Sequence, residues 1–405
     1  MRTHTALLGA FALGAASLLG ACADDSGATV IASEPIDATS TATLASTTPP
    51  GSTTTARPPA TTTSPTSTTS TTSTTSTTST TSTTSTTSTT STGADALPVG
   101  SYPNVEAAVF SLALGNVAVS VSVHREGVAP WGLAAGRQAD GALVTPDTTF
   151  VTASVSKLVT ALSVARLVAD GRLTTAAVVP WEALGLVRDP QWDDVTVREL
   201  LDHTSGMPVN TKSWLDDPGP CSIPLQEAVL APPTVERAEW RYSNGNYCAL
   251  GMLVEALTGQ ALDEAAYDLV FTPAGVTGPY LSTDGIRADS APSPRGVARL
   301  ARLGGAGSWL ASTDDIVTML DSVTEADREV LRWPGIILDQ YGWGHTGTVD
   351  GAKACAWVLE DGRTTVAAFV SGPRPATGGT VCDVVLPALA TDLGLWAGAP
   401  ARTPQ

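Results

Sequence analysis

A run of Ser, Thr, Pro and Ala residues between positions 23 and 96 limits what this chain can fold into. From Ser67 to Ser91 the run repeats the tripeptide Ser-Thr-Thr, and it carries few charges. Such a segment cannot bury enough apolar surface to offset the conformational entropy that is lost on ordering it. We therefore predict a disordered linker over residues 23–96, a folded domain over residues 97–396 and a short tail over residues 397–405.

The residues before the linker predict export. One Arg precedes a stretch of apolar and small residues that is too short to span a bilayer and has the length of a secretory signal. The stretch ends in Leu19-Gly20-Ala21-Cys22, which resembles the lipobox of bacterial lipoproteins. The resemblance implies a signal peptide over residues 1–22, a lipid on Cys22 and an extracytoplasmic protein anchored to the outer face of the cell membrane. An ordinary cleaved signal with an incidental cysteine is the alternative.

The charge balance excludes some partners. The chain has 22 basic and 39 acidic residues, a formal net charge of −17. An acidic surface disfavours nucleic acid and disfavours charge-driven binding to anionic lipid. We expect a monomer that contacts the membrane only through its lipid and takes a small-molecule or peptidoglycan-peptide substrate.

Four cysteines remain in the folded domain, and they predict two disulfides because an exported domain with an even number of cysteines forms bridges. Three connectivities exist, and a zinc site is the alternative, although no CxxC pair supports it. We predict no metal and no cofactor. Cys382 should begin a helix that packs on the strand of Cys355, and Cys221 and Cys248 flank one segment. We therefore favour the pairs Cys221–Cys248 and Cys355–Cys382.

The pattern of apolar residues indicates strands at both ends of the domain and helices between them. Residues 115–125 alternate with period two and residues 127–136 follow as a hairpin partner. The other predicted elements are helices near 154–170, 195–201, 246–257 and 382–393, and strands at 352–360 and 364–372 around an Asp-Gly-Arg turn. These predict an α/β (α+β) fold, in which an antiparallel sheet built from both termini is flanked by helices and a mostly helical lobe is inserted.

A lysine in an apolar helix is the first candidate catalytic group. Lys157 follows Ser154 by three residues, which places both side chains on one helical face. Burial lowers the pKa of an amine, and neutral Lys can then accept the serine proton, whereas Arg cannot. The alternative is a chance Ser-x-x-Lys sequence.

Two further short motifs carry polar side chains. Tyr242 and Asn244 lie two residues apart and could handle a leaving-group proton and a substrate amide. His345-Thr346-Gly347 offers an imidazole, a hydroxyl and a position without a side chain just before the C-terminal strands. Taken singly, each motif is equally well explained as local structure.

Together the three motifs resemble the serine β-lactamase and penicillin-binding protein superfamily, in its class C β-lactamase-like branch. That branch carries SxxK, YxN and KTG or HTG in this order. The segments VRELLDHTSGMP (197–208), YSNGNYCALGMLVEALTG (242–259) and GGAGSWLASTDDIV (304–317) add to the resemblance, which covers residues 116–393.

The resemblance implies a serine hydrolase of the β-lactamase/transpeptidase-like fold. Ser154 would be the acylated nucleophile, Lys157 its base and Tyr242 the catalytic tyrosine. Asn244 would contact the substrate amide, and His203 of the HTSG segment would be structural. His345 and Thr346 would meet the substrate carboxylate, and Gly347 would let a substrate pack against the strand edge. The backbone N–H groups of Ser154 and Thr348 would form the oxyanion hole.

His345 departs from the pattern of the β-lactamases, which usually have Lys there, whereas HTG occurs among the related DD-peptidases. An imidazole with its ordinary pKa of about 6.5 is only partly charged at neutral pH. This favours a DD-peptidase or esterase over an efficient β-lactamase. The expected substrates are D-amino-acid peptides, β-lactams or esters, and the alternative function is a non-hydrolytic penicillin-binding sensor or cell-wall-binding lipoprotein.

Overall fold

The computed structural model describes residues 100–114, 117–209, 214, 219–292, 297–331, 336–372 and 380–395. The signal peptide, Cys22, the linker and the C-terminal tail lie outside these residues, so those predictions remain expectations. Among the helices of the described residues, none combines the length and the hydropathy that a membrane span requires.

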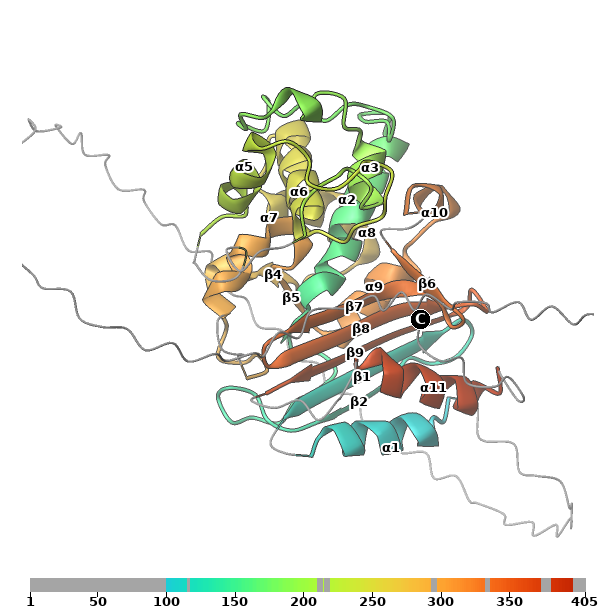
Figure 1. Cartoon of the computed structure of the whole chain (residues 1–405). Helices are drawn as coiled ribbons and strands as arrows, with labels where there is room; N and C mark the ends of the chain where they lie inside the picture. Colours follow the sequence, from blue (N-terminus) through green and yellow to red (C-terminus); the bar gives the residue numbers. More distant parts are fainter. Residues whose placement is uncertain are drawn as a thin grey trace, which may run out of the picture. The chain divides into compact units, whose positions relative to one another are not determined.

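A six-stranded antiparallel sheet joins the two ends of the folded domain (Figure 1). Its strand order is β2-β1-β9-β8-β7-β6. The strands are β1 (Ala118–Arg125), β2 (Trp131–Ala135), β6 (Ile337–Asp339), β7 (Gly342–Val349), β8 (Ala352–Leu359) and β9 (Thr364–Ser371). Strand β1 pairs with β9 over its whole length, from Ala118 opposite Ser371 to Arg125 opposite Thr364. The predicted sheet built from both termini is confirmed.

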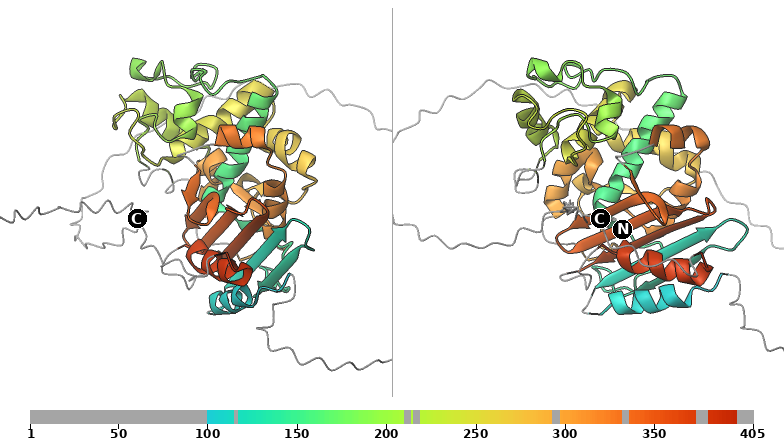
Figure 2. Two further views of the ribbon diagram at one scale, coloured as in Figure 1. Left: turned by 90° about the vertical axis from the view of Figure 1, so that its right-hand side faces the viewer. Right: turned by 45° about the vertical axis from the view of Figure 1, so that its right-hand side comes forward.

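Helices cover both faces of this sheet (Figure 2). On one face α1 (Pro103–Leu112) and α11 (Cys382–Leu393) lie side by side over β1, β8 and β9 and share an apolar core with them. On the other face α2 (Ser156–Ala169) and α9 (Thr313–Asp321) pack against the sheet and join it to the larger apolar core. Burial from both sides explains why β8 and β9 are apolar almost throughout.

The inserted lobe is mostly helical, as predicted, and carries a small second sheet of order β3-β5-β4. Its helices are α3 (Val197–Leu201), α5 (Ser222–Leu230), α6 (Asn244–Thr258), α7 (Leu262–Ala266), α8 (Thr272–Ala274) and α10 (Glu325–Leu331). The short strands are β3 (Phe150–Val151), β4 (Tyr280–Leu281) and β5 (Trp309–Ala311). The remaining turns are η1 (Ala153–Val155), η2 (Pro190–Trp192), the π-helical η3 (Tyr267–Phe271), η4 (Ser282–Asp284) and η5 (Val297–Ala306).

The structure corrects the predicted elements in two places. Helix α1 was not anticipated, although Val105, Ala108, Val109 and Leu112 have helical spacing and are all buried. The His345-Thr346-Gly347 motif lies inside β7 and not in a turn before the strands, because its glycines let neighbouring chain segments pack closely on this strand.

Both predicted disulfides are confirmed. The bridge Cys355–Cys382 ties β8 to the start of α11, and Cys221–Cys248 ties the start of α5 to α6.

Candidate active site

The turn that carries Ser154 is held in a strained backbone conformation. Ala153 is completely buried and has φ +46°, in the left-handed region that residues with a Cβ rarely adopt. The short turn η1 runs directly into α2, so the predicted helix near 154–170 is observed with a tighter first turn. This geometry leaves the Ser154 side chain partly exposed at the N-terminal end of the helix, while its neighbours Ala153 and Val155 are buried.

Strand β7 passes directly beside this turn. A Cβ on Gly347 would overlap the carbonyl oxygen of Thr152 and lie 3.2 Å from the Cβ of Ala153, so only glycine allows the approach. Strand β6 pairs with β7 only as far as Gly344, which leaves residues 345–349 of β7 with no partner on that edge within the described residues. Ser154 and Thr348, whose N–H groups we expect to form the oxyanion hole, lie on the two segments that meet here.

The amine of Lys157 is completely buried and makes three polar contacts. Its Nζ lies 2.7 Å from Asn244 Oδ1, 2.7 Å from the carbonyl oxygen of Ala306 and 3.2 Å from Ser154 Oγ. Burial lowers the pKa of Lys157 well below its usual value. A neutral amine has two N–H donors and one lone pair. In the neutral form the two oxygens at 2.7 Å would accept from these donors, which would leave the lone pair directed at the Ser154 hydroxyl.

Tyr242 reaches the same hydroxyl from the other side. Its O–H donates to Ser154 Oγ at 2.8 Å, and its ring centroid lies 4.9 Å from Lys157 Nζ. Ser154 can therefore accept from Tyr242 while it donates to Lys157. A proton can pass from the serine to the amine without a water between them.

Local capping explains why Tyr242 and Asn244 arrive together. The Ser243 side chain accepts from the backbone N–H of Gly245, which fixes the start of α6 between the two residues. Tyr242 thus lies in extended chain just before the helix, and Asn244 lies in its first turn. The amide of Asn244 binds Lys157 directly, a contact the sequence did not predict.

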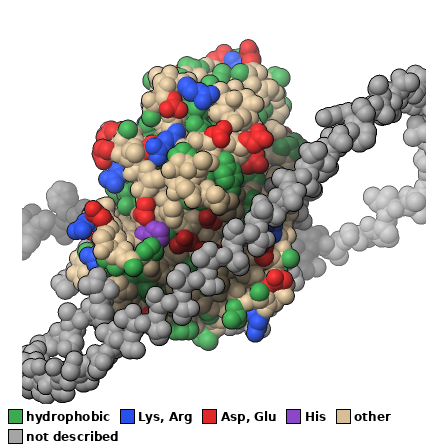
Figure 3. All heavy atoms as spheres, turned by 180° about the vertical axis from the view of Figure 1, so that it is seen from behind, with side chains coloured by type: hydrophobic (Ala, Val, Ile, Leu, Met, Phe, Trp, Pro, Cys, Tyr) green, Lys and Arg blue, Asp and Glu red, His purple; other side chains and the backbone are tan. Residues whose placement is uncertain are grey.

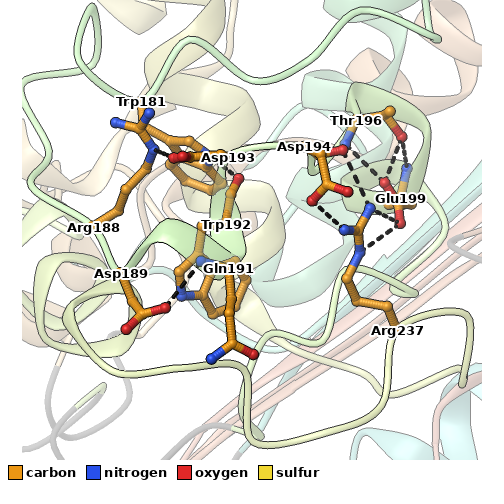
Figure 4. Close-up of polar contacts among 10 residues, drawn as sticks. All are labelled: Trp181, Arg188, Asp189, Gln191, Trp192, Asp193, Asp194, Thr196, Glu199 and Arg237. Atoms are coloured by element: carbon orange, nitrogen blue, oxygen red, sulfur yellow. Dashed lines mark hydrogen bonds and ion pairs between the residues drawn. The ribbon is translucent and has the colours of Figure 1, made fainter.

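An ion-pair network anchors the segment that leads to Tyr242 (Figure 4). Arg237 binds Asp194, and its Nη2 and Nε lie 2.6 and 3.0 Å from Glu199 Oε1. Glu199 also completes a capping box with Thr196 at the start of α3. The segment before Tyr242 is thereby fixed to the helix that precedes the HTSG residues.

His345 is neutral in this environment. Only 2 % of the residue is exposed, and its Nδ1 lies 2.5 Å from the carbonyl oxygen of Thr346, to which it donates. Burial, together with the nearby Lys157, lowers the pKa of His345 to about 3. The expectation that part of His345 is charged at neutral pH is therefore wrong for the free protein. Thr346 beside it is partly exposed and Thr348 is exposed.

The structure brings together the residues that sequence motifs pointed to: Ser154, Lys157, Tyr242, Asn244, His345, Thr346, Gly347 and Thr348. Sequence reasoning missed the carbonyl of Ala306, which lies in the GGAGSWLAS segment and could have been sought there. It also missed the contact between His203 and Tyr242, whose ring centroids are 4.7 Å apart. Among the described residues, no group of three or more His, Cys, Asp or Glu side chains is placed to hold a metal ion.

Comparison with known proteins agrees with this arrangement. The beta-lactamase family model matches residues 104–386, and the chain belongs to this family. The chain is 30% identical over 162 residues to the unguisins hydrolase ungD' of Aspergillus campestris, covering 36% of this chain and 29% of that protein. It is 33% identical over 145 residues to penicillin-binding protein 4 of Amycolatopsis lactamdurans, and the match covers 34% of this chain and 37% of that protein. The matches thus span about a third of each relative.

Solved structures share the fold at low sequence identity. The D-amino acid amidase from Ochrobactrum anthropi SV3, complexed with L-phenylalanine, superimposes with a TM-score of 0.61 at 20% identity. The match covers 72% of this chain and 98% of the amidase chain. The β-lactamase/transpeptidase-like fold expected from the motifs is confirmed.

Proposed function

We propose that the protein is an extracytoplasmic serine hydrolase that works through an acyl-enzyme on Ser154. One observation carries the proposal: a completely buried Lys157 amine, held by Asn244 and Ala306, lies 3.2 Å from Ser154 Oγ. In the proposed reaction Ser154 Oγ attacks a carbonyl carbon while its proton passes to Lys157. Tyr242 then delivers a proton to the leaving group and regains one from Lys157, and water later cleaves the acyl-enzyme to release the acid and free Ser154.

The neutral state of His345 supports an ester or peptide substrate over an efficiently hydrolysed β-lactam. An uncharged imidazole offers no ion pair to a substrate carboxylate, whereas a lysine at this position would. Thr346 and the unpaired edge of β7 provide hydrogen bonds in its place. We therefore propose a DD-peptidase or esterase that binds its substrate mainly by hydrogen bonds along β7.

The location and the assembly state complete the proposal. Cys22 would carry the lipid, the linker would separate the enzyme from the membrane, and the enzyme would act as a monomer on small or peptidoglycan-derived molecules. Acidic side chains are spread over both the helical lobe and the sheet on the face shown in Figure 3, and no continuous basic patch interrupts them among the described residues there. This charge distribution supports attachment through lipid and not through basic side chains.

Labelling with a fluorescent fluorophosphonate and a fluorescent penicillin tests the proposal. We expect the fluorophosphonate to label the wild type and not Ser154→Ala, which removes only one oxygen atom. Transient penicillin label indicates turnover, and permanent label indicates a slow peptidase or the alternative penicillin-binding sensor. Equal labelling of wild type and Ser154→Ala would refute the nucleophile.

A further inference from the structure

His203 lies against the ring of Tyr242 although it touches neither Ser154 nor Lys157. Its ring centroid is 4.7 Å from that of Tyr242 and 5.2 Å from that of Tyr247, both in tilted contacts. Only 1 % of His203 is exposed. The imidazole therefore packs against the Tyr242 ring and supports its position.

The backbone of His203 holds the same segment. His203 has φ +57°, a left-handed conformation, and its carbonyl oxygen accepts from the N–H of Arg241 at 2.8 Å. The next carbonyl, of Thr204, accepts from the N–H of Ala238 at 3.0 Å. The HTSG residues and the segment before Tyr242 thus run together, joined by backbone bonds as well as by the ring contact.

A chain of hydrogen bonds fixes the tautomer of His203. The N–H of Met207 donates to Ser205 Oγ at 3.2 Å, so the Ser205 hydroxyl proton goes to Asn246 Oδ1 at 2.6 Å. The other end of that amide, Asn246 Nδ2, then donates to His203 Nδ1 at 2.9 Å. With Nδ1 as acceptor, the proton of the neutral imidazole is on Nε2.

The surroundings oppose a charge on His203. Burial lowers the pKa of His203 well below its usual value. Four titratable groups lie around the ring: Tyr242, Tyr247, Lys157 on α2 and His345 on β7. The preceding residue, Asp202, forms an ion pair with Arg198. The donor at Nδ1 also disfavours the imidazolium form, which would need an acceptor there.

We propose that His203 is a positioning residue for Tyr242: a neutral imidazole, fixed by Asn246 and Ser205, that holds the Tyr242 hydroxyl on Ser154. The inference rests on the proposed function, because it assigns to Tyr242 the proton delivery described there. A misplaced Tyr242 would slow the expulsion of leaving groups that need a proton. It would barely affect leaving groups that depart as stable anions.

Aryl acetates provide the test, with kcat/KM, which reports the acylation step, measured from p-nitrophenyl acetate to phenyl acetate for four proteins: wild type, His203→Asn, Tyr242→Phe and the double variant. Asn tolerates the left-handed backbone of position 203. We expect His203→Asn to lower kcat/KM by about tenfold or more for phenyl acetate, and far less for p-nitrophenyl acetate. The double variant should match Tyr242→Phe alone, because both changes remove one function.

Two outcomes overturn the inference: equal losses on both esters, or losses that add in the double variant. If His203→Asn does not fold, Asn246→Asp replaces it. A carboxylate at position 246 accepts from Nδ1–H and favours the imidazolium, so kcat should acquire an acid-side decline that the wild type lacks. The absence of that decline overturns the inference as well. Unchanged ester turnover in Ser154→Ala refutes the proposed function itself, and this inference with it.

Discussion

Gly347 on β7 and Thr152, two residues before Ser154, are in such close contact that no side chain fits between them. A methyl group at position 347 would overlap the Thr152 carbonyl and press on Ala153, which already has a strained φ. The distance between β7 and the Ser154 turn therefore depends on one missing Cβ.

Gly347→Ala should separate these two segments. We expect a loss of kcat/KM of about 100-fold, since a displacement near 1 Å at a reacting centre has that cost, and a loss of about 1–3 kcal/mol in stability from overpacking. Ester kinetics and urea unfolding measure the two effects. Gly362→Asn in the β8–β9 turn is the control, because no atom lies within 4 Å of its Cβ position and Asn tolerates its φ of +62°. Full activity of Gly347→Ala would show that the close approach is not needed.

Lys157→Arg should abolish turnover. The guanidinium stays protonated and cannot take the proton of Ser154, so we expect kcat/KM to fall by about 100-fold or more. Lys353→Arg on β8, across from Thr348, makes the same chemical change at a residue with no assigned proton transfer and should cost far less. Retained activity in Lys157→Arg would exclude the lysine as the base.

The pH profile should carry no signature of His345. With a pKa lowered to about 3 by burial, the imidazole is neutral throughout the range from pH 5 to pH 8. The ratio of kcat/KM for a carboxylate-bearing ester to that for a neutral ester should therefore stay constant over this range. His345→Lys should raise the ratio, because an ammonium titrates near 10 when unperturbed. A wild-type ratio that falls through about pH 6.5 would show that His345 binds the carboxylate as a cation.

The two disulfides form a matched pair for separating stability from activity. Both span 27 residues, so replacing either pair with alanine should lower the free energy of unfolding by a similar amount, roughly 3 kcal/mol in the chain-entropy model. Cys221–Cys248 borders the residues that hold Lys157, since Cys248 lies one turn after Asn244 and a Cβ on Gly304 would lie 2.5 Å from Cys221 Sγ. Cys355 pairs with Thr346 across β7 and β8, but its bridge lies in the core shared with α11, away from the lysine contacts. We expect the loss of Cys221–Cys248 alone to lower kcat at a temperature where both variants are folded. Equal kcat values would show that the bridge does not support the lysine contacts.

His124 should make stability depend on pH. Its Nδ1 lies 2.7 Å from Asp321 Oδ2 on α9, and this hydrogen bond raises the pKa of His124 above its usual value. The pKa of His124 in the unfolded chain is about 6.5, and below that pH the stabilisation is complete. It disappears as the pH rises through the raised pKa of the folded state. His124→Gln should cost about 1 kcal/mol or less at pH 5.5, because the pair is partly exposed, and nothing at pH 9. Urea unfolding at both pH values measures the loss of stability in His124→Gln. An equal loss of stability at pH 5.5 and pH 9 would assign the effect to packing.

The motifs predicted which candidate catalytic groups lie together because the spacing of each motif along one element is local. Ser154 and Lys157 lie one turn apart in any helix, and Tyr242 and Asn244 flank one helix start. The ionisation of His345 was not predictable, since it depends on burial between β7 and the helical lobe. The contact of His203 with Tyr242 joins positions far apart in the chain through a left-handed residue that no local pattern marks.

The fold, like the site, was predictable where it depends on local sequence patterns and not where it depends on packing between distant segments. Alternation and turn residues located the C-terminal hairpin and its helix closely, and those same patterns implied the sheet built from both ends. The His345-Thr346-Gly347 motif was expected just before the C-terminal strands and lies inside β7 instead, because glycine needed for close packing looks the same in sequence as glycine needed for a turn.

The pairing of β1 with β9 also dictates an order of events during synthesis. Strand β1 ends at Arg125 and its partner begins at Thr364, so the ribosome must make nearly the whole domain before β1 can be paired on its inner edge. Long-range pairing of this kind closes late and leaves strand edges open meanwhile. Ser154 and Lys157 emerge early, but β7 follows only near the end. A nascent or truncated chain therefore carries Ser154 without the strand beside it, and the proposed hydrolysis requires the last strands to be released first.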